Sequence, residues 1–75
     1  MSRIHIVCKR KKDDAISIAR RIIDEFGKNH EIFLDEESAR AIGYEKQMEI
    51  EHVDENADFI IVLGGDGTLL SVSRH

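Results

Sequence analysis

The apolar and polar positions along the chain predict strands that alternate with helices. Arg3 to Cys8 alternates two sets of side chains with a period of two, as in a β-strand with one face well buried and the other less so. Residues 13–26 place their apolar side chains in one broad stripe at helical spacing, with polar side chains opposite, which indicates an amphipathic helix. A second strand follows at about Glu31 to Leu34. This order predicts a βαβ unit with parallel strands.

Local signals support these boundaries. Asp13 and Asp14 supply a side-chain cap and an acidic first turn to the helix, and Gly27 is placed to end it as a C′ glycine. His5 falls on the less buried face of the first strand, where we expect a half-exposed strand residue and not a ligand. Cys8 has no neighbouring base, so a small core residue is the better interpretation than a nucleophile.

Residues 35–57 give a weaker pattern. Ser38 to Ile42 fits a short helix that Gly43 would stop, and Tyr44 to His52 fits a second helical stretch with Met48 and Val53 directed inward. The neighbouring Glu51, His52 and Asp54 lack any recognised metal-ligand spacing, and adjacent residues do not share a helix face. We therefore predict no metal site in this part of the chain.

The strongest single signal is at Phe59 to Leu63, where five apolar residues stand in a row. Such a run is typical of a strand covered on both faces in a parallel sheet. It leads directly into Gly64-Gly65-Asp66-Gly67-Thr68, after which Leu69, Leu70 and Val72 predict the start of another helix. In an open α/β sheet, ligands bind outside the carboxyl ends of the strands, which is where this turn would lie.

The composition of the turn suggests a phosphate site. Its three glycines permit positive φ and let the backbone approach a ligand, and successive N–H groups can form a nest for phosphate oxygens. Asp66 would then bind a metal, orient a hydroxyl or take its proton. The alternative is a tight strand-to-helix turn in which Asp66 or Thr68 only caps the next helix. Adjacent glycines with an Asp, a third glycine and a Thr directly after a buried strand favour the phosphate site.

Composition and charge narrow the function. The 75 residues make one domain at most, and a net charge of −4 argues against a general nucleic-acid binder. A single cysteine excludes a disulfide framework. Strand residues begin immediately after Met1 and Ser2, and no apolar stretch approaches membrane-spanning length, so we expect no membrane association and a cytoplasmic protein.

A basic run, Lys9 to Lys12, follows the first strand and so falls on the same edge of the sheet as the glycine turn. It could assist the binding of a nucleotide's phosphates. A run of like charges is more commonly a solvated loop, and that interpretation is the simpler one here.

The sequence GGDGT at residues 64–68, after an apolar strand, resembles the signature of the NAD kinase, diacylglycerol/sphingosine kinase and 6-phosphofructokinase group. The continuation Leu69-Leu70-Ser71 is similar to NAD kinases, whereas lipid kinases usually continue with a Leu-Asn-Glu type sequence that is absent here. The amino-terminal strand, basic run and Asp-Asp-led helix also resemble an NAD kinase start. The resemblance implies an α/β fold, with a Rossmann-like three-layer parallel sheet.

The resemblance also implies a function. NAD kinases transfer a phosphoryl group from ATP, or in some members from polyphosphate, to the 2′-hydroxyl of the adenosine ribose of NAD, with a divalent ion such as Mg²⁺, and form homodimers or tetramers. Here Gly64, Gly65, Gly67 and Thr68 would bind phosphate, and Asp66 would be the catalytic residue. No residue is assigned as a metal ligand.

Residues 1–75 would then form part of the amino-terminal α/β nucleotide-binding domain, without the β-rich second domain that carries the family's Asn-Glu or Asn-Asp motif. We expect this fragment alone to be inactive. A lipid kinase and a non-catalytic nucleotide- or phosphate-binding module remain the alternatives. A diguanylate cyclase is set aside, since its motif continues with Glu-Phe where this chain has Gly67-Thr68.

Overall fold

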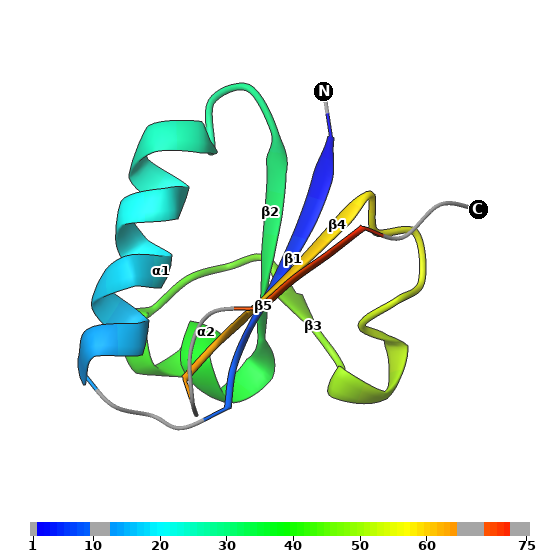
Figure 1. Ribbon diagram of the computed structural model, residues 1–75. Helices are drawn as coiled ribbons and strands as arrows, with labels where there is room; N and C mark the ends of the chain where they lie inside the picture. Colours follow the sequence, from blue (N-terminus) through cyan, green and yellow to red (C-terminus); the bar gives the residue numbers. More distant parts are fainter. Residues whose placement is uncertain (1, 10–12, 65–68, 73–75) are drawn as a thin grey trace.

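The computed structural model describes residues 2–9, 13–64 and 69–72. The chain alternates strands with helices over most of its length (Figure 1). Its elements are β1 Arg3–Cys8, α1 Asp13–Phe26, β2 Glu31–Asp35, α2 Glu36–Ile42, β3 Gln47–Met48, the short 3-10 helix η1 Ile50–His52, β4 Phe59–Leu63 and β5 Leu69–Val72.

The strands form one sheet in the order β3-β2-β1-β4-β5. The first four run parallel, and β5 pairs antiparallel with β4 at the edge. β1 therefore lies inside the sheet, with Ile6 level with Leu34 of β2 on one side and with Ile61 of β4 on the other. This confirms the predicted α/β fold with a Rossmann-like parallel sheet.

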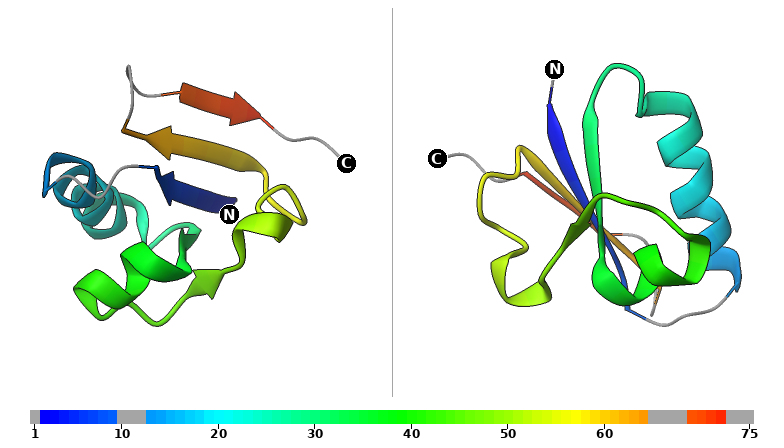
Figure 2. Two further views of the ribbon diagram at one scale, coloured as in Figure 1. Left: turned by 90° about the horizontal axis from the view of Figure 1, so that it is seen from below. Right: turned by 180° about the vertical axis from the view of Figure 1, so that it is seen from behind.

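Helices α1 and α2 lie on one face of the sheet, and the connection 49–58, which contains η1, lies on the other (Figures 1 and 2). The core is between the sheet and the two helices, where apolar side chains of β1, β2 and β4 meet the buried face of α1. Its buried members are Ile6, Cys8, Ala15, Ala19, Ile32, Leu34, Ala39 and Leu63.

Two glycines end the helices on this face, for different reasons. Gly43 follows α2 at φ 68° and ψ 34°, a left-handed conformation that confirms the predicted stop. α1 ends at Phe26, as predicted, but Gly27 is not among the residues of positive φ. A Cβ at Gly27 would lie 2.4 Å from the carbonyl oxygen of Ile23, so glycine is required there for close approach of the backbone.

The opposite face holds a polar and aromatic cluster around His5. The prediction that His5 is half-exposed was wrong, since only 1% of the residue is accessible. Its Nδ1 lies 2.6 Å from the carbonyl oxygen of Val53 and Nε2 lies 3.0 Å from Nε of Arg3. A carbonyl only accepts, so Nδ1 carries the proton and Nε2 accepts from Arg3. The Phe33 ring packs edge-on against His5 at 5.6 Å and takes the Arg3 guanidinium at 4.1 Å over its face.

β4 was predicted to be covered on both faces, and this was wrong for most of its length. Leu63 is buried, but Phe59, Ile60, Ile61 and Val62 are only partly buried. One reason is that the helices cover one face, whereas the connection 49–58 contacts the other face at β1, where the Val53 carbonyl lies against the His5 ring. Ile60 and Val62, level with His5 and Val7, therefore remain partly accessible.

Two predicted helices are also absent. The predicted helix at Tyr44 to His52 is replaced by β3 and η1, because the chain pairs with β2 instead: Leu34 N donates to Lys46 O at 3.0 Å. Met48 is buried as predicted, but from a strand. The helix predicted after Thr68 was likewise wrong, since residues 69–72 form β5. Four residues, three of them apolar, fit the period of either a helix or a strand, and pairing with β4 decides between the two.

Candidate functional site

The carboxyl ends of β1, β2 and β4 meet at one edge of the sheet, because the three strands are parallel. Cys8 at the end of β1 is level with Leu63 at the end of β4, and the next amide, Lys9 N, donates to Leu63 O at 2.9 Å. Lys9 is exposed. The first residue of the basic run therefore lies beside the strand that leads into the glycine turn, as predicted.

Gly64 is the one predicted site residue within the described part of the chain. Its φ is 98°, a left-handed conformation that other residue types rarely adopt, so the chain needs glycine where it leaves β4. Gly65, Asp66, Gly67 and Thr68 lie outside the described residues. Their roles in phosphate binding and catalysis stay predictions, as does the phosphate-binding role of Gly64.

Asp35 at the end of β2 belongs to the same edge, and sequence reasoning missed it. Only 2% of the residue is accessible. Its Oδ1 accepts from Cys8 N at 3.1 Å, and Oδ2 accepts from Ser38 N at 3.2 Å as the N-cap of α2. A signal was present in the sequence: an Asp after a short apolar strand, followed by Glu36 and Glu37, is typical of a capped helix start. The bond to Cys8, 27 residues away, has no local signal.

Cys8 is a core residue, as predicted. It is buried against α1, with Sγ 4.0 Å from the carbonyl oxygen of Ala15. Burial raises the pKa of the thiol; the Ser38 hydroxyl opposes this shift and the Asp35 carboxylate adds to it. A thiol whose pKa is raised in this way is a poor nucleophile at neutral pH.

The region of Glu51, His52 and Asp54 has the geometry of a surface turn. His52 is about half-exposed and contacts two carboxylates of the same connection, Glu55 at 3.0 Å and Glu49 at 3.5 Å. The hydrogen bond to Glu55 is the main cause of the raised pKa of His52, and the charges of Glu55, Glu49 and Glu51 add to it. Among the residues the structure describes, no three His, Cys, Asp or Glu side chains are placed to hold a metal ion.

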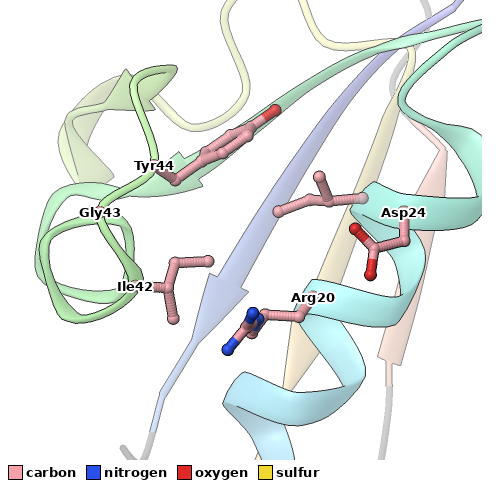
Figure 3. A pocket seen from close by; sticks show the side chains of 6 residues that line it. Arg20, Asp24, Ile42, Gly43 and Tyr44 are labelled. Atoms are coloured by element: carbon pink, nitrogen blue, oxygen red, sulfur yellow. The ribbon is translucent and has the colours of Figure 1, made fainter.

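A small hollow lies on the helical face between α1 and the end of α2 (Figure 3). Its volume is about 150 Å³, and it is lined by Arg20, Ile23, Asp24, Ile42, Gly43 and Tyr44. Tyr44 lines it, and the hydroxyl of this residue donates to Ile32 O at 2.7 Å. Pockets for small ligands typically measure about 300–1,000 Å³, so this hollow is too small for a nucleotide.

Comparison with known proteins identifies the family. The model of the ATP-NAD kinase N-terminal domain matches residues 4–75, which is nearly the whole chain. The chain belongs to the ATP-NAD kinase family. The resemblance drawn from residues 64–71 is therefore confirmed at the level of the family. Within the 2–9, 13–64 and 69–72 ranges, no helix of this family member is long and apolar enough to cross a membrane.

Curated relatives of this ATP-NAD kinase domain carry the name NAD kinase. The protein of Syntrophotalea carbinolica is 40% identical over 77 residues, covering 100% of this chain and 27% of the relative. The protein of Chloroherpeton thalassium is 38% identical, over 92% of this chain and 25% of the relative. The protein of Pyrococcus abyssi is 32% identical, over 96% of this chain and 27% of the relative. The chain thus spans about a quarter of the length of these relatives. No solved structure matches it significantly.

Proposed function

We propose that the protein containing this chain is an NAD kinase, which transfers a phosphoryl group from ATP to the 2′-hydroxyl of the adenosine ribose of NAD and so forms NADP. The observation that carries the proposal is the family match over residues 4–75, which includes the glycine turn. Supporting it, β4 ends at the carboxyl edge of the sheet next to the end of β1, and the glycine turn follows β4 directly in the sequence.

Each residue of the turn has a chemical task in this proposal. Phosphoryl transfer depends mostly on positioning the groups and neutralising phosphate charge. The backbone amides of Gly64, Gly65 and Gly67 would donate to phosphate oxygens, and the Thr68 hydroxyl would add a further donor. Asp66 would orient the ribose hydroxyl and accept its proton, or would act through a metal ion. A base in this role must come within hydrogen-bond reach of the hydroxyl.

The remaining parts of the proposal concern what surrounds the turn. A divalent ion, Mg²⁺ by expectation, would neutralise charge on the nucleotide's phosphates, and inorganic polyphosphate is an alternative donor. Residues 1–75 would be part of the amino-terminal α/β domain, and a β-rich second domain would supply the family's Asn-Glu or Asn-Asp contacts to the dinucleotide. We propose a cytoplasmic homo-oligomer, a dimer or a tetramer.

The test is to purify the full-length protein and measure NADP formation from NAD with ATP and Mg²⁺, comparing the wild type with Asp66→Asn. The substitution keeps the size of the side chain but removes its charge and its proton acceptor. Loss of a general base typically lowers kcat by about 10²–10⁴-fold, and we expect an effect in this range. Asp24→Asn is the matched control, because Asp24 is exposed on α1, and its kcat should stay within about twofold of the wild type.

The outcomes separate the alternatives. Wild-type protein that binds ATP or NAD without forming NADP would indicate a binding module, and phosphorylation of a diacylglycerol in place of NAD would indicate a lipid kinase. Polyphosphate in place of ATP tests the donor in the same assay. If Asp66→Asn retained turnover within a factor of about three, the general-base role would be refuted even if the protein were an NAD kinase.

A further inference from the structure

The carboxyl edge contains a buried carboxylate that the proposed chemistry does not use. Asp35 lies at the end of β2, between the end of β1 and the first turn of α2, and 2% of it is accessible. Placing a carboxylate out of water is costly unless donors surround it. Its two oxygens accept from the amides of Cys8 and Ser38, at 3.1 and 3.2 Å. An uncharged side chain such as Ser could cap α2 at a lower desolvation cost.

The bond to Cys8 connects Asp35 to the glycine turn. Cys8 is the last residue of β1, so the carboxylate holds the point at which this strand ends. The next amide, Lys9 N, donates to Leu63 O at 2.9 Å, and Leu63 is the last residue of β4. Gly64 follows at once, with φ 98°. Two consecutive amides, Cys8 N at the end of β1 and Lys9 N just after it, thus link Asp35 on one side to Leu63 on the other.

We infer that Asp35 is a positioning residue: by fixing the carboxyl end of β1 through Cys8 N, it fixes the departure of the glycine turn from β4. This inference rests on the proposed function, because only in an NAD kinase would the position of the glycine turn determine the rate of phosphoryl transfer. Displacement of reacting groups by about 1 Å can cost on the order of 10²-fold in rate. Asp35 touches no reacting atom in this assignment and acts only through the backbone.

The competing explanation is that Asp35 merely caps α2. Asp35→Asn and Asp35→Ser separate the two roles, because both residues are good N-caps. Cys8 N and Ser38 N bind different oxygens of Asp35, and Asn and Ser each have only one acceptor oxygen to place at these two positions. Gly43→Ala is the matched control. It destabilises α2 at its other end, since φ is 68° there and the added Cβ meets nothing within 4 Å, so backbone strain is the only effect.

The experiment uses the full-length protein, well below its melting temperature, and has two readouts. In the NADP assay, both Asp35 variants should lower kcat by about ten- to a hundredfold, whereas Gly43→Ala should stay within about twofold at a comparable loss of thermal stability. In amide hydrogen exchange, the amide of Lys9, which donates to Leu63 O, should exchange about tenfold faster in the Asp35 variants and at the wild-type rate in Gly43→Ala.

Each result decides something. If the Asp35 variants matched Gly43→Ala in both readouts, Asp35 would be a helix cap and the inference would be overturned. If the wild type formed no NADP, the proposed function would fail. The exchange rate of the Lys9 amide would still show whether Asp35 holds the two strand ends together. Normal exchange in the Asp35 variants together with reduced kcat would also overturn the inference, because the effect would not pass through the backbone.

Discussion

Replacing His5 with Phe should release the connection 49–58 from the sheet. The substitution keeps an aromatic ring against Phe33, whose ring centre now lies 5.6 Å from that of His5. It removes both ring nitrogens. The carbonyl of Val53 then loses its donor at 2.6 Å, and Arg3 Nε loses its acceptor at 3.0 Å. Arg3 and Val53 are both partly accessible, so water can replace part of what each group loses, and most fully at Val53 if the connection moves away from the sheet.

The magnitude follows from the Val53 carbonyl. Leaving a buried acceptor without a partner costs about 1–3 kcal/mol. Val53 is only partly buried, so we expect the free energy of opening of the connection to fall by about 1 kcal/mol, the lower end of that range. With 1.4 kcal/mol per factor of ten, this is roughly a fivefold change in the opening equilibrium. Hydrogen exchange measured by mass spectrometry on peptides covering residues 49–58, at pH 8, should show exchange faster by about that factor.

The same bond predicts a dependence on pH. Burial lowers the pKa of His5, the Val53 carbonyl opposes this shift, and the Arg3 charge adds to it. Because the pKa is depressed in the folded state, the stabilisation is complete above the unfolded value of about 6.5 and is lost as pH falls below it through the folded pKa. Opening of the connection, corrected for intrinsic exchange, should therefore increase on acidification in the wild type, and His5→Phe should remove most of this increase.

His52, in the same connection, is the control. Its pKa is raised, mainly by the hydrogen bond to Glu55, so its stabilising effect is present below about pH 6.5 and is lost as pH rises through the folded pKa, opposite in sign to that of His5. The side chain is exposed, and His52→Gln should leave exchange at pH 8 unchanged. Exchange in His5→Phe within about 1.5-fold of the wild type at pH 8 would refute the argument that the Val53 carbonyl depends on His5.

Three further predictions concern the edge and the uncovered face. Neutralising Lys9 and Arg10 together should raise the KM for ATP more than that for NAD, by an amount that shrinks as ionic strength rises; equal and salt-independent constants would restore the solvated-loop interpretation. The 75 residues alone should form no NADP, and they should associate because β4 is only partly covered. A monodisperse monomer in a sizing experiment that also formed NADP would contradict this. Cys8 should react with iodoacetamide at pH 8 only as fast as the protein opens, since the thiol is buried and its pKa is raised. Reaction at the rate of a free thiol would show that the Cys8 side chain is accessible.

The parts of the fold that the sequence predicted are those with a clear apolar pattern, either periodic or continuous. β1, α1, β2 and β4 each span five or more residues with one pattern, and the run at Phe59–Leu63 also placed the glycine turn at a strand end. β3 has two residues, too few to show a period, and was hidden inside an apparent helical pattern. Residues 69–72 were assigned to a helix because only pairing with β4 distinguishes the two structures.

The missed residues share a different cause. Asp35 and His5 are both polar and both almost fully buried, and a sequence gives no direct sign of the partner that makes such burial possible. Those partners are backbone groups 27 and 48 residues away along the chain. Asp35 could have been found as a helix cap, but its link to β1 and the burial of His5 become visible only when the strands are placed side by side.

The position of β1 inside the sheet has a consequence for how the protein is made. Its neighbour β4 lies 55 residues further along the chain, the separation of the paired Arg3 and Asp58. At about 5–20 residues per second, the ribosome adds β4 roughly 3–11 s after β1. During that interval β1 can pair only with β2, and one of its edges stays open to other nascent chains. We therefore expect the amino-terminal βαβ unit to form first, and the glycine turn to acquire its fixed geometry only when β4 completes the inner part of the sheet.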